Sequence, residues 1–413
     1  MSDFTIGLLG HGTVGGAFAE LVAERADAVE HVTGLRPRIG GVLTRSRGNF
    51  DEILRDADLV VELLGGIEPA REHVLAAMRA GRHVVTANKQ LLAQHGEELW
   101  TCAREHDVQL RFEASVAGVV PVVRVLHEAL AGAHIERVHG IVNGTTNFIL
   151  SEMARSGLSY PDALAEAQRL GYAEADPSAD VSGADAAAKM AILARLAFDT
   201  PVSLADVRYE GIELITADDL EYAHELGLAL KLIGTAERVR HPKDATREGV
   251  NVRVHPAFLY AGHPLASVGG PFNAVTIESP AITEITLQGP GAGGPQTASA
   301  VLGDVVSTML PPAWNPPPGT PLEIVGDVES AFYLHLDVAD RPGVLAQVAE
   351  LLGMQGASIK SVVQKGLGEN ARLVMVVHPL LESSFFAAVE LIDRLDFVRS
   401  RPRAIRVIEE HFG

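Results

Sequence analysis

The stretch TIGLLGHGTVG, residues 5–15, joins a short apolar run to a glycine-rich turn. The apolar run predicts a strand over residues 5–9, and the residues after the turn predict a helix over 13–24. Strand and helix patterns continue to alternate over the first 115 residues. Further strands are predicted at 38–44, 59–64, 83–86 and 109–114, and helices at 68–80 and 90–105. This alternation implies an α/β fold with a doubly wound parallel sheet.

The glycine-rich turn has the features of a dinucleotide-binding, Rossmann-type unit. Gly10 allows the tight turn, Gly12 lets a pyrophosphate approach the backbone, and Gly15 lets helix and strand pack closely. The helix that begins with Thr13 and Val14 offers free N–H groups and a partial positive charge to the anion. The position of this turn in the first strand–helix unit predicts that it binds NAD or NADP.

The end of the second predicted strand bears on the choice between the two cofactors. An NAD-specific site usually carries an acid there to bind the ribose hydroxyl, whereas this strand ends LTRSR, residues 43–47. Arg45 is therefore expected to hold the 2′-phosphate of NADP. Two alternatives remain: Arg45 and Arg47 are solvated loop charges, or Glu30 binds the ribose. Glu30 has roughly the right spacing but is predicted to precede the strand.

The pattern changes after residue 114. It predicts a helix over 119–131, a strand over 134–142, a helix-rich stretch from 146 to about 232, strands between 250 and 287, and a closing helix over 294–309. These elements indicate a second domain of the α+β type.

A proline-rich segment separates this part from the C-terminal region. Prolines stand at positions 311, 312, 316, 317, 318 and 321, and such a run favours a linker because it neither continues a helix nor donates to a sheet. Beyond it a small βαββαβ sandwich is predicted, with elements over 331–338, 343–352, 357–364, 372–378, 385–395 and 403–408. We therefore divide the chain into residues 1–130, 131–310, a linker at 311–328, and 329–413.

The amino-acid composition limits the kinds of partner that the protein is expected to bind and the cellular compartment in which it is expected to lie. The net charge of −19 disfavours binding to nucleic acid. The single cysteine, Cys102, lies in a predicted helix and excludes a disulfide within the chain, as expected for a cytoplasmic protein. No apolar run approaches the ~20 residues of a membrane span, so no membrane association is expected.

The segment AQRLGYAEADPSADVSGADAAAK, residues 167–189, gathers four carboxylates and a lysine just before a predicted helix. Asp185 and Lys189 are four residues apart and so share one face of that helix. The same face continues through Ile192 and Leu193, which indicates that the pair points toward the interior. An exposed ion pair is the alternative, but unpaired charges are costly inside a protein, so a buried Asp–Lys pair favours a functional site.

A lysine in such a place suits a dehydrogenase that acts on an alcohol. The hydroxyl must lose a proton when hydride leaves, and burial can lower a lysine pKa from ~10.4 into the working range. Arginine does not lose its proton at useful pH, so Lys189 and Lys89 mark positions where lysine chemistry is expected.

The segment 167–189 resembles the signature of the homoserine dehydrogenase family throughout its length. The resemblance covers essentially the whole chain, including motifs at residues 10–15, 86–89, 113–118, 143–147 and 289–294. It implies interconversion of L-homoserine and L-aspartate 4-semialdehyde with NADP or NAD, in the biosynthesis of threonine, methionine and isoleucine. It also implies that residues 131–310 serve catalysis and dimerisation, in a homodimer or homotetramer.

The resemblance also implies roles for single residues. Lys189 would be the proton donor and acceptor, with Asp185 beside it. Glu174 and Asp180 would bind the substrate, Glu174 at its amino group. Lys89 would lie where cofactor and substrate meet, and would polarise the reacting oxygen or bind the substrate carboxylate.

Two loops complete the site that the resemblance implies. A monovalent cation, commonly sodium, would be held mostly through backbone carbonyls at Glu113, Val116, Gly118 and Val120. The loop with Gly291 and Gly294 would close over the nicotinamide; its alternative is a flexible turn before a helix.

The C-terminal region resembles an ACT domain, with L-threonine as the expected effector. Asp340 is predicted to be the N-cap of its first helix, and Gly343 would let a ligand approach the backbone. Val344, Leu345 and Gln364 would complete the pocket, with Gln364 as the polar contact. The alternative is a domain that only assists dimerisation.

Two other classes of protein compete with this interpretation. Another ACT-containing dehydrogenase of amino-acid biosynthesis, such as phosphoglycerate dehydrogenase, would need a histidine–carboxylate pair, and none aligns. A non-catalytic amino-acid sensor would be expected to have lost catalytic residues, whereas Glu174, Asp185 and Lys189 are all present.

Overall fold

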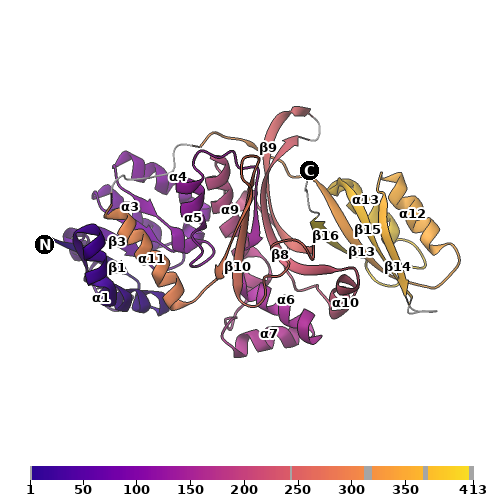
Figure 1. Ribbon diagram of the computed structural model, residues 1–413, viewed down its shortest axis with the longest axis horizontal. Coiled ribbons are helices and arrows are strands. Elements are labelled where there is room, and N and C mark those ends of the chain that lie inside the picture. Colours follow the sequence, from indigo (N-terminus) through magenta and orange to yellow (C-terminus); the bar gives the residue numbers. More distant parts are fainter. Residues whose placement is uncertain (1, 242–243, 311–318, 366–370, 409–413) are drawn as a thin grey trace.

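The computed structural model describes residues 2–241, 244–310, 319–365 and 371–408. Most of the predicted proline-rich linker, residues 311–318, lies outside this part. Figure 1 shows three parts along the long axis: a sheet with helices on the left, a second sheet in the centre, and a third helix-covered sheet on the right.

The N-terminal part is the predicted parallel sheet. Its five strands lie in the order β2-β1-β3-β4-β5, and every pair is parallel. The strands are β1 (Ser2–Leu9), β2 (Leu35–Leu43), β3 (Leu59–Glu62), β4 (His83–Thr86) and β5 (Leu110–Arg111). The helices are α1 (Thr13–Thr33), α2 (Phe50–Asp56), α3 (Ala70–Arg79) and α4 (Lys89–Glu105), which carries the buried Cys102. The strand order reverses between β1 and β3, the point where such sheets bind ligands at their carboxyl edge.

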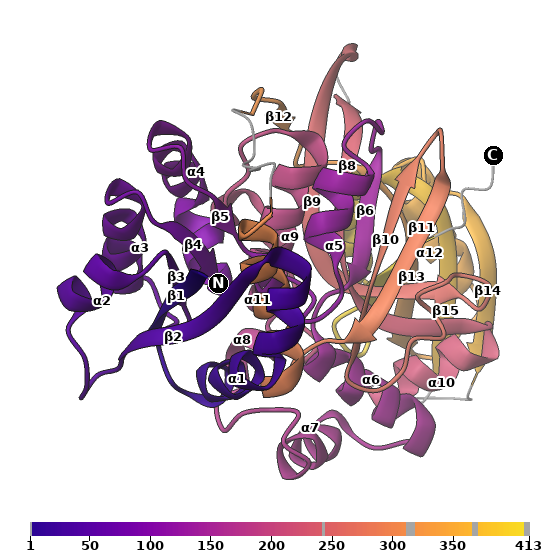
Figure 2. The same cartoon turned by 60° about the vertical axis from the view of Figure 1, so that its left-hand side comes forward.

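Both faces of this sheet are covered. Ile6 and Leu8 pack toward α1 on one face, together with Val301 of α11 (Gly294–Thr308). Leu9 packs toward α3 and α4 on the other face. Helix α11 follows the central sheet in sequence but returns to lie beside α1, as Figure 2 shows.

Two predicted elements in this part differ clearly from the structure, and one helix was not predicted. The predicted strand 109–114 keeps only β5, because the Glu113 N–H donates to the Asp304 carboxylate and η1 (Glu113–Ser115) follows. The predicted helix 119–131 begins after Pro121, as α5 (Val122–Arg124) and the π-helical turn η2 (Val125–Ala129). Helix α2 was not predicted; it is short, and the Asn49 side chain caps it.

The central part is a mixed sheet with helices packed on one face. Its strands are β6 (Arg137–Ile141), β7 (Arg208–Tyr209), β8 (Leu228–His241), β9 (Asp244–Tyr260), β10 (Phe272–Ser279) and β11 (Thr283–Pro290). Its helices are α6 (Gly144–Ser156), α7 (Tyr160–Arg169), α8 (Ser178–Val181), α9 (Ala184–Phe198) and α10 (Ala217–Glu225), with η3 (Leu204–Asp206) between α9 and β7. Helix α9 lies so close to β8 that a Cβ on Gly234 would overlap the Met190 side chain.

The prediction of helix up to residue 232 was wrong. Strand β8 begins at Leu228, and Leu228, Leu230 and Leu232 all pack into the same core. Such packing of every second side chain into one core is typical of a strand.

The C-terminal part confirms the βαββαβ order. Its elements are β13 (Glu329–Val338), α12 (Val344–Met354), β14 (Ile359–Lys365), β15 (Ala371–Leu381), α13 (Glu382–Asp393) and β16 (Arg403–Ile408). Both helices pack on one face of this sheet. The predicted N-cap is wrong: α12 begins after Gly343, which has a φ of +91° and takes the cap position itself.

The central and C-terminal sheets are continuous, which was not predicted. Strand β16 pairs in parallel with β9, with Val407 opposite Phe258. Strand β12 (Glu323–Ile324), which falls within the predicted linker, also pairs with β9. One sheet of eleven strands therefore runs through both parts. In the described residues, no helix combines the length and apolar character needed to cross a membrane.

Candidate active site

The carboxylate of Asp185 lies between two ammonium groups. Its Oδ1 is 2.7 Å from Lys89 Nζ, and its Oδ2 is 2.7 Å from Lys189 Nζ. Asp185 and Lys189 stand in α9 of the central part, whereas Lys89 begins α4 at the carboxyl edge of the parallel sheet. The cluster therefore joins the two parts at the edge where a dinucleotide is expected.

Lys189 projects inward, as its spacing from Asp185 predicts. Only 9% of the residue is exposed, and Nζ donates to the Val142 carbonyl at 2.7 Å as well as to Asp185. The Lys89 side chain is 38% exposed, so its ammonium lies on the more open side of the cluster.

Asn143 links the carboxylates of this cluster, and the sequence did not single it out. Its Nδ2 donates to Asp180 Oδ1 at 2.7 Å and to Asp185 Oδ2 at 2.8 Å. Its Oδ1 accepts from the Thr146 N–H and so caps α6. The motif at residues 143–147 was the signal for this residue, but a motif alone does not show which side chains a residue reaches.

Burial and charge act in opposite directions on the ionisable groups of the site. Burial raises the pKa of Asp185, but Lys189 and Lys89 lower it more, so the net pKa lies well below its ordinary value. Burial is the largest single effect on Lys89 and lowers its pKa, but Asp185, Asp180 and Glu174 together raise it more. Asp180 has a raised pKa, chiefly because it is buried. At neutral pH Asp185 is therefore a carboxylate and Lys89 an ammonium.

Glu174, a predicted substrate ligand, lies on the exposed turn between α7 and α8. Its main-chain carbonyl accepts from Gln168 Nε2 at 3.1 Å. Its charge, with those of Asp180 and Asp185, raises the pKa of Lys89. Glu174, Asp180 and Asp185 thus all lie close enough to Lys89 to act on its charge.

The glycine turn has the shape that a pyrophosphate needs. A Cβ on Gly10 or on Gly15 would overlap backbone, whereas a Cβ on Gly12 would meet no atom within 4 Å. Gly12 is also the N-cap of α1, with no side-chain cap and no acid in the first turn, where Thr13 and Val14 stand. The open space and uncapped N–H groups fit an anionic ligand.

Arg45 lies in the exposed turn after β2, close to the glycine turn. The Gly10 N–H donates to the Leu43 carbonyl at 2.8 Å, which places the end of β2 beside Gly10. Glu30 stands in α1 and pairs with Arg36 at 2.7 Å. Glu30 therefore precedes β2, as the sequence predicted.

The loop before α11 contacts two other predicted parts of the site. A Cβ on Gly294, where the loop enters α11, would lie 3.2 Å from the Thr13 side chain, so the end of this loop rests on the start of α1. A Cβ on Gly118 would lie 2.5 Å from the Gly291 carbonyl oxygen. The loop thus connects the glycine turn with the predicted cation-binding segment.

That segment is buried and irregular. Glu113, Val116, Gly118 and Val120 are all buried, and Gly118 has a φ of +66°. The Glu113 carboxylate accepts the N–H groups of Val123 and Arg124, both at 2.9 Å. Within the described residues no group of three or more His, Cys, Asp or Glu is placed to hold a metal, so a cation here would depend on main-chain carbonyls.

The predicted effector residues lie at the far end of the molecule. Asp340, Gly343, Leu345 and Gln364 are exposed, whereas Val344 packs in the core of the C-terminal part. Gln364 is opposite Leu373 on β15, which is opposite Leu336 on β13. This register places Gln364 at the same end of the sheet as the loop that leads into α12. Figure 1 shows this part on the opposite side of the central sheet from the parallel sheet.

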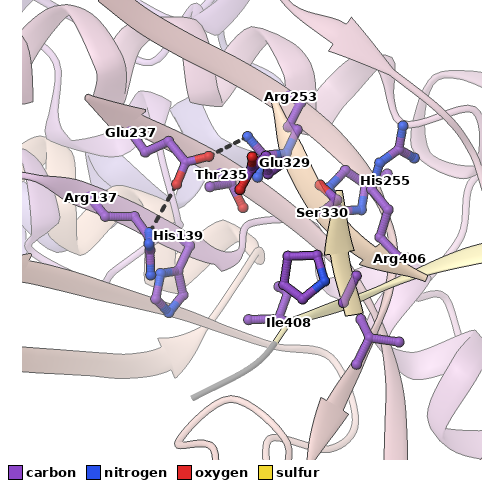
Figure 3. A pocket seen from close by; sticks show the side chains of 13 residues that line it. Arg137, His139, Thr235, Glu237, Arg253, His255, Glu329, Ser330, Arg406 and Ile408 are labelled. Carbon is purple, nitrogen blue, oxygen red and sulfur yellow. Dashed lines mark hydrogen bonds and ion pairs between the residues drawn. The ribbon is translucent and has the colours of Figure 1, made fainter. Parts of the chain in front are cut away.

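A pocket of about 180 Å³ lies elsewhere, between the central sheet and β13 and β16 (Figure 3). Glu237 pairs with Arg137 at 3.1 Å and with Arg253 at 2.5 Å along its wall. None of the predicted catalytic, cofactor or effector residues lines it. We therefore do not assign the active site to this pocket.

Known families and structures match the chain over most of its length. A family model for the NAD-binding domain of homoserine dehydrogenase matches residues 10–113, and one for homoserine dehydrogenase matches residues 121–306. A homoserine dehydrogenase of Corynebacterium glutamicum is 44% identical over 97% of this chain and 95% of its own.

Two solved structures extend the comparison. The crystal structure of a homoserine dehydrogenase from Thiobacillus denitrificans is 38% identical, with a TM-score of 0.94 over 99% of both chains. A hyperthermophilic archaeal homoserine dehydrogenase in complex with NADPH is 27% identical, with a TM-score of 0.64 over 76% of this chain and 100% of that one.

A parallel sheet with a glycine turn, next to a buried lysine–carboxylate pair, defines a dinucleotide-dependent oxidoreductase. The homoserine dehydrogenases described above align with nearly the full length of this chain. The chain belongs to the homoserine dehydrogenase family and is an NAD(P)-dependent oxidoreductase.

Proposed function

We propose that the chain interconverts L-homoserine and L-aspartate 4-semialdehyde in the biosynthesis of threonine, methionine and isoleucine. The observation that supports this most is the position of the Lys189 ammonium, 2.7 Å from both Asp185 Oδ2 and the Val142 carbonyl. An ammonium group has three N–H donors. Two are used within the protein, and the third is left for the oxygen of a substrate.

Lys189 moves the proton in this reaction. A bound nicotinamide ring supplies the hydride acceptor or donor. When the hydroxyl is oxidised, the Lys189 amine takes its proton, and in the reverse direction the ammonium returns a proton to the carbonyl oxygen. Asp185 contacts both ammonium groups, so it holds Lys189 in place beside Lys89.

The surrounding charges suit an amino-acid substrate. Glu174 and Asp180 bind its amino group, and both carboxylates lie near enough to Lys89 to raise its pKa. Lys89 binds the substrate carboxylate or polarises the reacting oxygen. Asn143 holds Asp180 and Asp185 in place through its two hydrogen bonds.

The preferred cofactor is NADP, held by the glycine turn at Gly10, Gly12, Thr13, Val14 and Gly15. Arg45 binds the 2′-phosphate, since no acid stands at the end of β2. The archaeal relative in complex with NADPH supports this choice. Lys89 and the loop with Gly291 and Gly294 lie against the nicotinamide.

A monovalent cation, sodium in our proposal, binds the segment of Glu113, Val116, Gly118 and Val120. The two carboxylate oxygens of Glu113 accept main-chain N–H groups, so Glu113 binds the cation through its main-chain carbonyl. Hard cations prefer such oxygen ligands. The ion would stiffen the loop beside Gly291 without taking part in proton transfer.

The C-terminal part serves regulation in this proposal. Residues 329–413 form an ACT domain that binds L-threonine with Asp340, Gly343, Val344, Leu345 and Gln364. Residues 1–130 bind the dinucleotide, residues 131–310 carry catalysis and dimerisation, and residues 311–328 link them to the regulatory domain. We place the enzyme in the cytoplasm as a homodimer or homotetramer.

The proposal is tested by following NADPH at 340 nm with the wild-type chain. We expect reduction of NADP with L-homoserine, a slower rate with NAD, and inhibition by L-threonine. 3-Phosphoglycerate is the matched control, because a phosphoglycerate dehydrogenase would oxidise it. Reduction of cofactor with 3-phosphoglycerate but not with homoserine would overturn the proposal, as would inactivity with both.

A further inference from the structure

Lys231 is a buried lysine of β8 for which neither the proposed reaction nor any predicted site has a role. It is 6% exposed. Its Nζ donates to the Val268 carbonyl at 2.5 Å and to Asn147 Oδ1 at 3.1 Å. Among the described residues no carboxylate forms an ion pair with it. An ammonium group buried without a counter-ion is costly, so its contacts require an explanation.

Asn147 extends the contact from Lys231 to a whole segment of chain. It lies in the first turn of α6 and is 1% exposed. Its Nδ2 donates to the carbonyls of Val268, Gly270 and Phe272, at 3.2, 3.0 and 3.2 Å. Several carbonyl oxygens thus converge on the Asn147 amide and the Lys231 ammonium, and a cation compensates their partial negative charges.

The segment held in this way contacts the loop before α11. The Gly291 N–H donates to the Pro271 carbonyl at 3.3 Å. A Cβ on Gly291 would lie 2.5 Å from the amide of Asn273, which is fully buried beneath it. The position of Gly291 therefore depends on residues 268–273, and these depend on Lys231 and Asn147.

The same contacts reach the start of α6. A Cβ on Gly144 would lie 2.7 Å from the Pro271 carbonyl oxygen. Gly144 follows Asn143, whose side chain holds Asp180 and Asp185. The segment 268–273 thus lies between the helix that orders the carboxylates and the loop that is proposed to cover the nicotinamide.

We propose that Lys231 is a positioning residue of the active site: through Asn147 and residues 268–273 it sets where the Gly291 loop lies against the bound cofactor. This inference rests on the proposed role of that loop. Lys231 touches neither substrate nor cofactor, and it acts by fixing the distance between the loop and the glycine turn.

The test compares Lys231→Met with Asn147→Asp, which keeps the acceptor for Lys231 but removes the donors to the three carbonyls. We expect the NADPH dissociation constant, from fluorescence titration, to rise and kcat to fall by about tenfold to a hundredfold in each. The KM for homoserine should change less, because Glu174 and Lys89 lie outside the segment. Ile392→Val, which removes one buried methylene from the separate core of the C-terminal part, is the control and should leave all three values unchanged.

The following results would contradict the proposed positioning role of Lys231. If a folded variant binds NADPH and turns over as the wild type does, Lys231 has a purely structural role and the proposal is wrong. It is equally wrong if neither variant folds, or if Ile392→Val shows the same kinetic defect. Failure of the proposed function would be distinct, because the wild-type chain itself would then not oxidise homoserine, while NADPH titration would still compare the variants.

Discussion

Lys89 and Asp185 form an ion pair of 2.7 Å between two parts of the chain that fold on different sheets. Lys89 is held by the parallel sheet and Asp185 by helix α9. Because Asp185 also binds Lys189, the position of the proton-transferring group is tied to the part that binds the cofactor. A change at Asp185 should therefore affect catalysis.

Asp185→Asn tests this relationship. The amide carries no charge to offset the two ammonium groups, so Lys89 and Lys189 should repel each other and leave their places. We expect kcat for homoserine oxidation to fall by about 10²- to 10⁴-fold, and the NADPH dissociation constant to rise by a smaller factor, because Lys89 is also proposed to lie beside the nicotinamide. Asp176→Asn, an exposed carboxylate of the same segment, is the control and should retain activity. A fall of less than threefold in Asp185→Asn would count against the cluster.

Two glycine variants separate cofactor binding from folding. Gly12→Ala adds a methyl group into open space, so the chain should fold normally while the pyrophosphate loses its close approach. We expect NADPH affinity to fall roughly tenfold or more, for the loss of one or two N–H contacts of ~1 kcal/mol each. Gly15→Ala places its methyl group against the Gly10 carbonyl and should lower the melting temperature. If Gly12→Ala binds NADPH normally, the anion lies elsewhere.

Arg45 is expected to set the preference between NADP and NAD. Arg45→Glu replaces a partner of the 2′-phosphate by a charge that repels it, and the carboxylate is able to bind a ribose hydroxyl. The ratio of kcat/KM for NADP over NAD should fall roughly tenfold to a hundredfold. Arg25→Glu, an exposed charge on α1, makes the same change in net charge and should leave the ratio unaltered. An unchanged ratio in Arg45→Glu would mean that Arg45 is a solvated loop charge.

The lowered pKa of Lys231 predicts that the stability of the protein depends on pH between about 8 and 10.5. Burial lowers its pKa from 10.5 to about 8. Between these values the unfolded chain binds a proton that the folded chain does not, so the free energy of unfolding rises with pH. Relative to Lys231→Met, the wild type should gain roughly 3 kcal/mol across the window, with little change below pH 8. Urea titrations of both proteins from pH 7 to 10.5 measure this difference; a flat difference would refute it.

Short sequence patterns correctly predicted those strands and helix faces that are determined by residues close together in the sequence. Strands β4 and β16 have the predicted bounds, 83–86 and 403–408. The inward direction of Lys189 followed from its four-residue spacing from Asp185 and from the apolar residues farther along that helix face. The spacing of apolar residues gave a wrong prediction at Leu228–Leu232. Apolar residues are so frequent there that a strand pattern was taken for a continuing helix.

Contacts between distant segments left no local signal. The pairing of β16 with β9, the return of α11 to α1, and the hydrogen bond from Glu113 to Asp304 join residues far apart in sequence. Asn143 belongs to a motif that the sequence marked, but its bonds to Asp180 and Asp185 depend on how α6 and α9 pack. Lys231 stands alone among apolar residues, and only the fold shows that carbonyl groups surround it.

The central claim is that Lys189 exchanges a proton with the reacting oxygen, and Lys189→Met tests it most directly. Methionine has a similar length and no proton to give. We predict that kcat for homoserine oxidation falls by at least about 10²-fold at every pH from 7 to 10, while fluorescence titration shows NADPH bound as in the wild type. A Lys189→Met protein that oxidises homoserine at a rate near that of the wild type would contradict the account.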